Sequence, residues 1–313
     1  MAWSASAYIC LLLSIFFFTS AESNSNKIDD IGAAEIDADK ILLSFYTCNA
    51  TDPTTSIDCR IQDINCTENA YNLLSTGKNE TTIFLHGYHR NREPMLNIIS
   101  AYCSKNTSVV ALFDWTQLQP EIVSLSVTNW TSTIGKIAAP TFGALKNKGY
   151  NVGTWHLVGH SMGVHIAGCI AKYTNFSWSH ITGLDPAGTV FYTNMYEGCQ
   201  ITPESATFTE MFYTDVNGYG INEKVGTLNI YANTGTAPQP GCYSAQNIRW
   251  CSHFKAIEWY ADSVRNETKY VATKCENCLV ALDFYSFCEK NNRVYLGPRV
   301  NNEASGQYCV AID

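Results

Sequence analysis

The spacing of apolar and polar residues predicts a chain in which short strands and longer helices follow one another. Apolar runs with the length of buried strands occupy residues 41–46, 81–85, 109–115, 155–158 and 181–185. Stretches typical of helices occupy residues 131–146, 164–171 and 252–264, and Pro140 within the first of them predicts a kink or an early end. The polar segment 48–66 is expected to be looped, and the acidic segment 22–40 a loose start.

One junction between a predicted strand and a predicted helix carries a candidate nucleophile. The apolar run 155–158 leads into Gly159-His160-Ser161-Met162-Gly163, and the helical stretch 164–171 follows. A serine at the tip of such a glycine turn is typical of the nucleophile elbow of an α/β-hydrolase. The alternative is a glycine-rich surface turn, so a hydrolase also requires a base, an acid and an oxyanion hole.

The order of residues along the chain limits the choice of base and acid. In an α/β-hydrolase the acid follows the serine and the histidine follows the acid. Only His253 lies beyond the candidate acids, so it is the expected base, and His160 beside the serine is expected to be structural. Asp185 and Asp215 end successive predicted strands, at the sheet edge where sites form. These arguments favour Asp185 and leave Asp215 open.

The end of an earlier strand offers an oxyanion hole. Residues 81–85 lead into His86-Gly87-Tyr88, the position where this fold places one backbone donor. We expect the backbone N–H groups of Tyr88 and Met162 to stabilise the oxyanion. His86 is expected to shape the loop. Asp114 precedes the nucleophile and is expected to cap its strand.

Several motifs taken together resemble the animal pancreatic-lipase family. They are Phe84-Leu85-His86-Gly87-Tyr88, Asp114-Trp115, Gly159-His160-Ser161-Met162-Gly163, Gly183-Leu184-Asp185-Pro186-Ala187-Gly188, and Gln239-Pro240-Gly241-Cys242 with Cys251-Ser252-His253. The resemblance is closest to arthropod secreted lipases and wasp-venom phospholipases A1. It implies one α/β-hydrolase domain, with a mostly parallel central sheet and helices on both faces. It also implies Ser161 as nucleophile, Asp185 as acid and His253 as base, without a C-terminal β-sandwich domain.

Two short loops near the expected base bear on the substrate. Cys242 and Cys251, an expected disulfide, enclose only residues 243–250, and the loop 217–225 is also short. Triglyceride lipases of the family have a long lid, whereas its phospholipases A1 have short ones. The resemblance therefore implies a glycerolipid esterase acting at a membrane or micelle surface, with phospholipase A1 activity favoured over triacylglycerol hydrolysis. A non-catalytic, yolk-like lipid-binding protein is the alternative from another class, and the intact triad argues against it.

The first residues and the cysteines predict a secreted protein. Residues 8–18 form an apolar core too short to span a bilayer, which predicts a signal peptide over 1–21 and a lipase domain over 22–313. Removing Cys10 with that leader leaves twelve of the 13 cysteines, an even number that predicts disulfides. Disulfides are also expected, rather than a zinc cluster, for Cys275, Cys278, Cys288 and Cys309. A Cys48–Cys103 pair is implied by position in the family.

Sequons and charge complete the expected surroundings of the domain. Candidate glycosylation sites are Asn49, Asn65, Asn79, Asn106, Asn129, Asn175 and Asn266. The formal net charge of −8 argues against a nucleic-acid partner. The segment 196–206 departs from the family pattern, which puts the structural calcium of some members in doubt. No metal, cofactor or colipase is expected, and the protein is expected to be a monomer.

Overall fold

The structure is a computed structural model that describes residues 36–49, 55–88, 92–118, 124–188, 199–278 and 288–313. The expected signal peptide, residues 1–21, lies outside these residues. No helix in the described part of the chain is long and apolar enough to cross a membrane.

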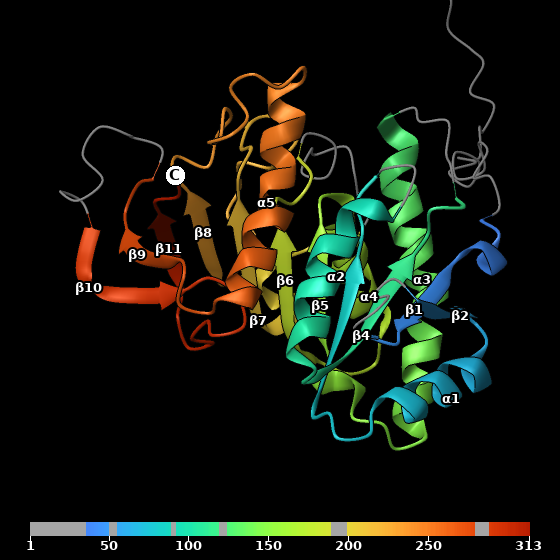
Figure 1. Ribbon diagram of the computed structural model, residues 1–313. Helices are drawn as coiled ribbons and strands as arrows, with labels where there is room; N and C mark the ends of the chain where they lie inside the picture. The colour runs from blue at the N-terminus through green and yellow to red at the C-terminus, as the bar shows by residue number, and fades with distance from the viewer. Residues whose placement is uncertain (1–35, 50–54, 89–91, 119–123, 189–198, 279–287) are drawn as a thin grey trace, which may run out of the picture. The chain divides into compact units, whose positions relative to one another are not determined.

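A single sheet of 11 strands organises the described chain, in the order β10-β9-β11-β8-β7-β6-β5-β3-β4-β1-β2 (Figure 1). The strands are β1 (Leu42–Tyr46), β2 (Ser56–Arg60), β3 (Glu80–Leu85), β4 (Ser108–Asp114), β5 (His156–His160), β6 (Trp178–Leu184), β7 (Ala206–Tyr213), β8 (Leu228–Ala232), β9 (Val271–Cys275), β10 (Cys288–Tyr295) and β11 (Gly306–Val310). The central strands from β11 to β4 are parallel. The outer strands β1, β2, β9 and β10 pair antiparallel.

Helices cover both faces of this sheet. They are α1 (Ile64–Leu74), α2 (Glu93–Lys105), α3 (Ser124–Asn147), α4 (Met162–Tyr173) and α5 (Ile248–Arg265). On one face α2 packs against α5, and on the other α3 packs against α4 and α1 (Figure 1). Each group closes one apolar core over the sheet, so the expected mostly parallel sheet with helices on both faces is confirmed.

The strands expected from the apolar runs correspond to β1, β3, β4, β5 and β6. Two other expectations were wrong. The helix around Pro140 does not end early: α3 continues to Asn147 because the proline ring faces solvent while Ile134, Ala138 and Phe142 bury the opposite side. The segment 48–66 is not all loop, since β2 pairs with β1 there and buries Cys59.

Disulfides join all twelve cysteines of the described residues, while Cys10 lies outside them. The pairs are Cys48–Cys103, Cys59–Cys66, Cys169–Cys199, Cys242–Cys251, Cys275–Cys288 and Cys278–Cys309. The expected pairs Cys242–Cys251 and Cys48–Cys103 are both present. The C-terminal cysteines form two disulfides, as expected, rather than a zinc cluster.

Candidate active site

The turn between β5 and α4 holds Ser161 in an unusual backbone conformation. Its φ of 54° and ψ of −122° lie in the region that non-glycine residues rarely adopt, and the Ser161 N–H donates to Leu184 O at 3.0 Å. A Cβ on Gly163 would overlap the carbonyl oxygens of Leu85 and His86, so β3 and α4 pass each other only with glycine there. The chain therefore places a partly exposed serine at the carboxyl edge of the parallel strands.

Asp185 and His253, which are 68 residues apart, meet beside this turn. His253 Nδ1 lies 2.5 Å from Asp185 Oδ2, and both side chains are buried. The other carboxylate oxygen, Oδ1, accepts the backbone N–H groups of Thr214 at 2.7 Å and Asp215 at 3.0 Å. Because Nδ1 donates to the carboxylate, the neutral ring carries its lone pair on Nε2, where it can accept a proton.

The other candidate acid, Asp215, faces away from this pair. Its Oδ2 accepts the Tyr219 N–H at 2.8 Å, and its Oδ1 lies 3.5 Å from Arg249 Nη1. Burial raises the pKa of Asp215 to about 6, the Tyr219 N–H opposes the rise, and the charge of Asp185 adds to it. Only the backbone of Asp215 contacts Asp185, so the geometry favours Asp185 as the partner of His253.

His160 has a supporting contact that sequence reasoning did not identify. Its Nε2 donates to the His253 backbone oxygen at 3.2 Å, and its ring centroid lies 4.5 Å from that of His253. It therefore packs against the expected base instead of reaching the serine hydroxyl. The sequence did not predict this contact because His160 and His253 are far apart along the chain and no local pattern connects them.

The segment after β3 lies against Ser161. A Cβ on Gly87 would come within 2.8 Å of the Ser161 Cβ, so glycine allows this approach. His86 fixes the turn, because Nδ1 donates to Gly87 O at 2.8 Å and Nε2 accepts the Trp115 N–H at 3.0 Å. This brings the Tyr88 segment beside Ser161, while Met162 begins α4, where backbone N–H groups point out of the helix.

Asp114 supports the same region from the end of β4. Its Oδ1 accepts the Thr116 N–H at 2.9 Å, and its Oδ2 pairs with Arg92 Nη2 at 3.1 Å. Burial alone would raise the pKa of Asp114, but the neighbouring His86 and the hydrogen bonds donated by Thr116 outweigh it and hold the pKa below its ordinary value. The position agrees with a strand cap, as expected.

An exposed apolar rim surrounds the site, and the sequence pattern did not reveal it. Tyr219 and Trp250 are 41% and 40% exposed, and their rings lie 5.5 and 6.3 Å from the His253 ring. Tyr243 and Ile248, both within the Cys242–Cys251 loop, are also exposed, as is Tyr88. The sequence did not predict this rim because its residues come from three separate segments of the chain.

The sheet order, the strained serine turn and the buried aspartate–histidine pair define an α/β-hydrolase. The family comparison is more specific: the chain belongs to the lipase family, whose sequence model matches residues 22–307. Lipase member H of Danio rerio is 28% identical over 204 residues, which are 63% of this chain and 44% of that protein. Lipoprotein lipase of Bos taurus is 29% identical over 227 residues, which are 64% of this chain and 46% of that protein.

The chain therefore spans less than half the length of these two relatives. Among solved structures, MGS-M1, an alpha/beta hydrolase enzyme from a Medee basin deep-sea metagenome library, is 15% identical with a TM-score of 0.26. That similarity covers 62% of this chain and 69% of the other chain. The strand order described above, rather than this partial similarity, defines the fold.

Proposed function

We propose that this protein hydrolyses acyl esters of glycerolipids, with Ser161 as nucleophile. His253 Nε2 takes the proton of the Ser161 hydroxyl as Oγ attacks the acyl carbonyl carbon. The backbone N–H groups of Tyr88 and Met162 stabilise the oxyanion. His253 then gives its proton to the leaving alcohol, and water cleaves the acyl-enzyme by the same steps. This mechanism uses only protein groups and water, and the Asp185–His253 contact at the serine turn carries the proposal.

The preferred substrates in this proposal are phospholipids cleaved at the sn-1 ester, the A1 position. Two features of the loops beside His253 support this choice. The Cys242–Cys251 disulfide closes the loop that enters α5, and Asn247 in that loop donates to the Tyr219 hydroxyl at 3.3 Å. Tyr219 in turn is held by the Asp215 carboxylate. Short loops tied to each other leave room for a polar head group and are poorly suited to cover a long apolar cleft.

The exposed apolar rim supports a lipid substrate presented at a surface. Aromatic side chains with polar tips favour the boundary between water and lipid. Tyr219 and Trp250 flank His253, so a membrane or micelle that contacts the rim delivers ester groups close to the base.

A comparison of lipid substrates tests this preference. Fatty-acid release from phosphatidylcholine and from triolein, each in mixed micelles, is measured for the wild-type protein and for Ser161→Ala. We expect faster release from phosphatidylcholine, and at least about 10³-fold loss of both activities in Ser161→Ala. A strong preference for triolein would contradict the short-loop argument. Failure of a fluorophosphonate probe to label the wild-type serine would favour a non-catalytic lipid-binding protein.

We also propose that the protein is secreted. The six disulfides are typical of an oxidising compartment. All seven sequon asparagines are exposed. Expression in insect cells should place the protein in the medium, and treatment with an N-glycosidase should increase its gel mobility. Retention inside the cells without any mobility shift would contradict this proposal.

A further inference from the structure

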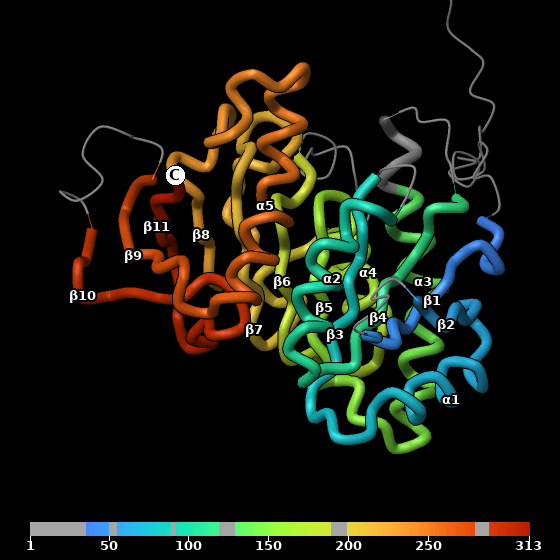
Figure 2. The backbone as a smooth tube through the Cα atoms, in the orientation of Figure 1, coloured from blue at the N-terminus to red at the C-terminus, as the bar shows by residue number. Residues whose placement is uncertain are grey.

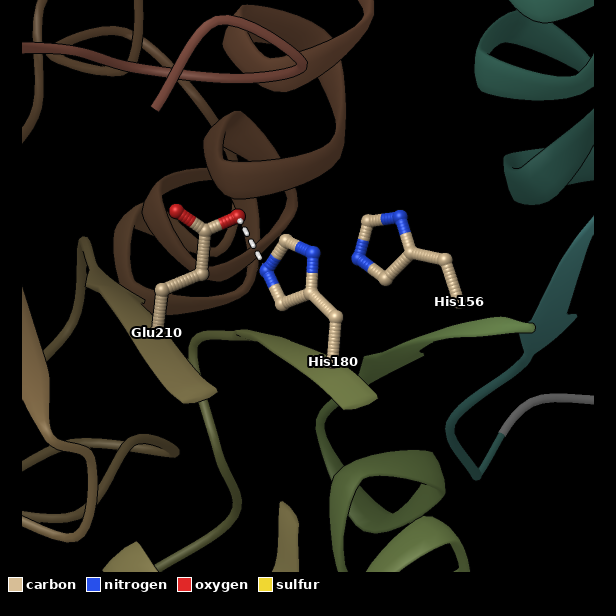
Figure 3. Close-up of side chains that lie close together, drawn as sticks. All are labelled: His156, His180 and Glu210. Atoms are coloured by element: carbon tan, nitrogen blue, oxygen red, sulfur yellow. Dashed lines mark ion pairs between the residues drawn. The ribbon is translucent and has the colours of Figure 1, made fainter. Parts of the chain in front are cut away.

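A second group of titratable side chains lies on the sheet face covered by α2 and α5, away from the proposed triad. His156, His180 and Glu210 come from the adjacent parallel strands β5, β6 and β7, and His156 pairs in register with His180 (Figure 3). The two imidazole rings stack with centroids 3.9 Å apart and an interplanar angle of 7°. One ligand-capable atom of each of the three residues lies within 4.8 Å of the other two.

The hydrogen bonds at this cluster leave its acceptors incompletely satisfied. The Thr182 hydroxyl lies 2.6 Å from His156 Nε2, 2.6 Å from Glu210 Oε1 and 3.4 Å from His180 Nε2. One hydroxyl proton cannot be donated to all three. Glu210 is only 2% exposed, and its Oε2 has no hydrogen-bond partner among the described residues. A buried carboxylate with so few donors is costly unless a cation neutralises it.

The charge of the cluster also suits a cation. A neutral imidazole can offer a nitrogen lone pair to a metal ion. Glu210 Oε1 lies 3.5 Å from His180 Nε2, so the carboxylate and the imidazole already face each other (Figure 3).

A cavity gives access to the two histidines of this cluster, and Glu210 lies buried behind them. It has a volume of 470 Å³, and its lining includes His156, His180, Tyr102 and Asn79. It is large enough for a hydrated ion to enter and for water to complete the coordination.

We propose that His156, His180 and Glu210 bind one zinc ion. Two imidazole nitrogens and one carboxylate oxygen are a known zinc ligand set, with a water as the fourth ligand. Ligands at about 2.0–2.1 Å from zinc lie roughly 3.3 Å apart, so the cluster must contract by about 1.5 Å at most. Because the two imidazole planes are nearly parallel, one ring must also rotate out of the stack before both nitrogens can face one ion. Rotation of the Glu210 carboxylate supplies the rest of the contraction, and Thr182 remains to orient that carboxylate.

The proposed ion lies far from the proposed triad. His156 begins β5 and Ser161 follows its end, so five strand steps, on the order of 16 Å, separate them. Glu210 pairs with Thr182, three residues before Asp185, which is a separation on the order of 10 Å. The ion would therefore join the three parallel strands β5, β6 and β7 and stabilise the fold, without entering the ester chemistry. In this respect the inference is independent of the proposed function.

Zinc titration of the full-length protein tests the proposal. The metal-free protein competes with a chromophoric chelator for Zn²⁺, and its Tm is measured with and without the ion. We expect one ion per chain and a rise in Tm when zinc is added. Glu210→Gln and His180→Gln should each weaken zinc binding by at least about 100-fold and abolish the rise in Tm.

Two controls separate this site from other carboxylates and from the triad. Glu258→Gln changes an exposed glutamate of α5 and should bind zinc like the wild type. His253→Gln should also retain binding, because the proposed site does not include the triad. Three results would each overturn the proposal. The wild type binds no zinc, or Glu210→Gln and His180→Gln bind zinc as tightly as the wild type, or His253→Gln loses binding. Should Glu210→Gln fail to fold, His180→Gln decides, because that side chain is 23% exposed.

Discussion

At the scale of single residues, substitutions of two buried aspartates near His253 are expected to change activity to different extents. Asp185 orients the ring through Nδ1, whereas Asp215 contributes its backbone N–H to Asp185 and its carboxylate to Tyr219. We expect Asp185→Asn to lower kcat/KM by about 10³–10⁴-fold, because the amide no longer holds the productive tautomer of His253. Asp215→Asn should retain most activity, since the backbone donor remains.

Hydrolysis of a soluble p-nitrophenyl ester by the two variants measures this difference without a lipid surface. Both are isosteric changes of buried carboxylates, so each is the control for the other. Equal losses in the two variants would show that the Asp185–His253 contact is not the functional one.

The raised pKa of Asp215 predicts how stability varies with pH. Its folded pKa of about 6 lies above the ordinary value of 3.8, so the folded protein binds this proton more tightly than the unfolded chain. The stabilisation is therefore complete below about pH 4 and is lost as pH rises through about 6. Relative to Asp215→Asn, the wild type should lose up to about 3 kcal/mol of unfolding free energy between about pH 4 and about pH 7.

Urea unfolding of both proteins across this range checks the sign. Subtracting the variant curve removes the titration of the other groups. A difference that stays constant or grows with pH would contradict the raised pKa.

Sequence reasoning reached the residues whose order along the chain is constrained by the fold. Ser161 stands in a local motif, and His253 followed because only one histidine lies beyond the acids. The choice between Asp185 and Asp215 needed the family resemblance, since both end parallel strands. The support from His160 depends on how α5 packs over the turn after β5, and no local pattern encodes that contact.

At the scale of elements, the spacing of apolar residues predicted most of the central strands, because each is buried on both faces. The edge strand β2 was missed, since it exposes polar residues and buries only Cys59. The helix end predicted at Pro140 was wrong for a related reason. Packing of the buried side of α3 outweighs the lost hydrogen bond of one exposed proline. Tertiary contacts thus overrode local propensity in both cases, through pairing with β1 in the first and burial in the second.

Replacement by alanine is expected to change stability in opposite directions at two helical glycines, one packed against β3 and one without close neighbours. In Gly163→Ala the new Cβ meets the backbone oxygens of Leu85 and His86, which side-chain rotation cannot relieve. We expect a loss of about 1–3 kcal/mol or more. A methyl group added to Gly143 in α3 would meet no neighbouring atom within 4 Å, so Gly143→Ala should stabilise the helix by about 0.5–1 kcal/mol.

Chemical unfolding of the two alanine variants, monitored by circular dichroism, gives both values. Gly143→Ala controls for the general effect of the substitution on a helix. A Gly163→Ala protein as stable as the wild type would show that the close approach at the elbow can relax.

At the scale of the whole molecule, disulfides concentrate at the two ends of the sheet. Cys59–Cys66 and Cys48–Cys103 hold the β1–β2 end, and Cys275–Cys288 and Cys278–Cys309 hold the β9–β10–β11 end. The backbone path in Figure 2 shows these outer strands on either side of the parallel strands that carry the proposed site. The sequence indicated an even set of cysteines, and the family resemblance implied the Cys48–Cys103 pair, but the other three pairings were not predicted because twelve cysteines allow very many pairings.

Two of these bridges close loops of very different length, which predicts unequal contributions to stability. Cys48 and Cys103 are 55 residues apart, whereas Cys59 and Cys66 are 7 apart. If a disulfide acts mainly by restricting the unfolded chain, the longer loop stabilises more, by about 2 kcal/mol for this ratio of lengths. The double variant C48A/C103A should therefore lose about 2 kcal/mol more than C59A/C66A.

Equilibrium urea unfolding of the two double variants decides between two explanations of this stabilisation. Both pairs join a strand or its end to a helix at the same end of the sheet, so C59A/C66A is a matched control. Equal losses, or a larger loss in C59A/C66A, would mean that native packing around the buried Cys59 dominates over chain entropy. The expected order would instead identify Cys48–Cys103 as the bridge that limits unfolding at this edge, where β1 and β2 pair antiparallel.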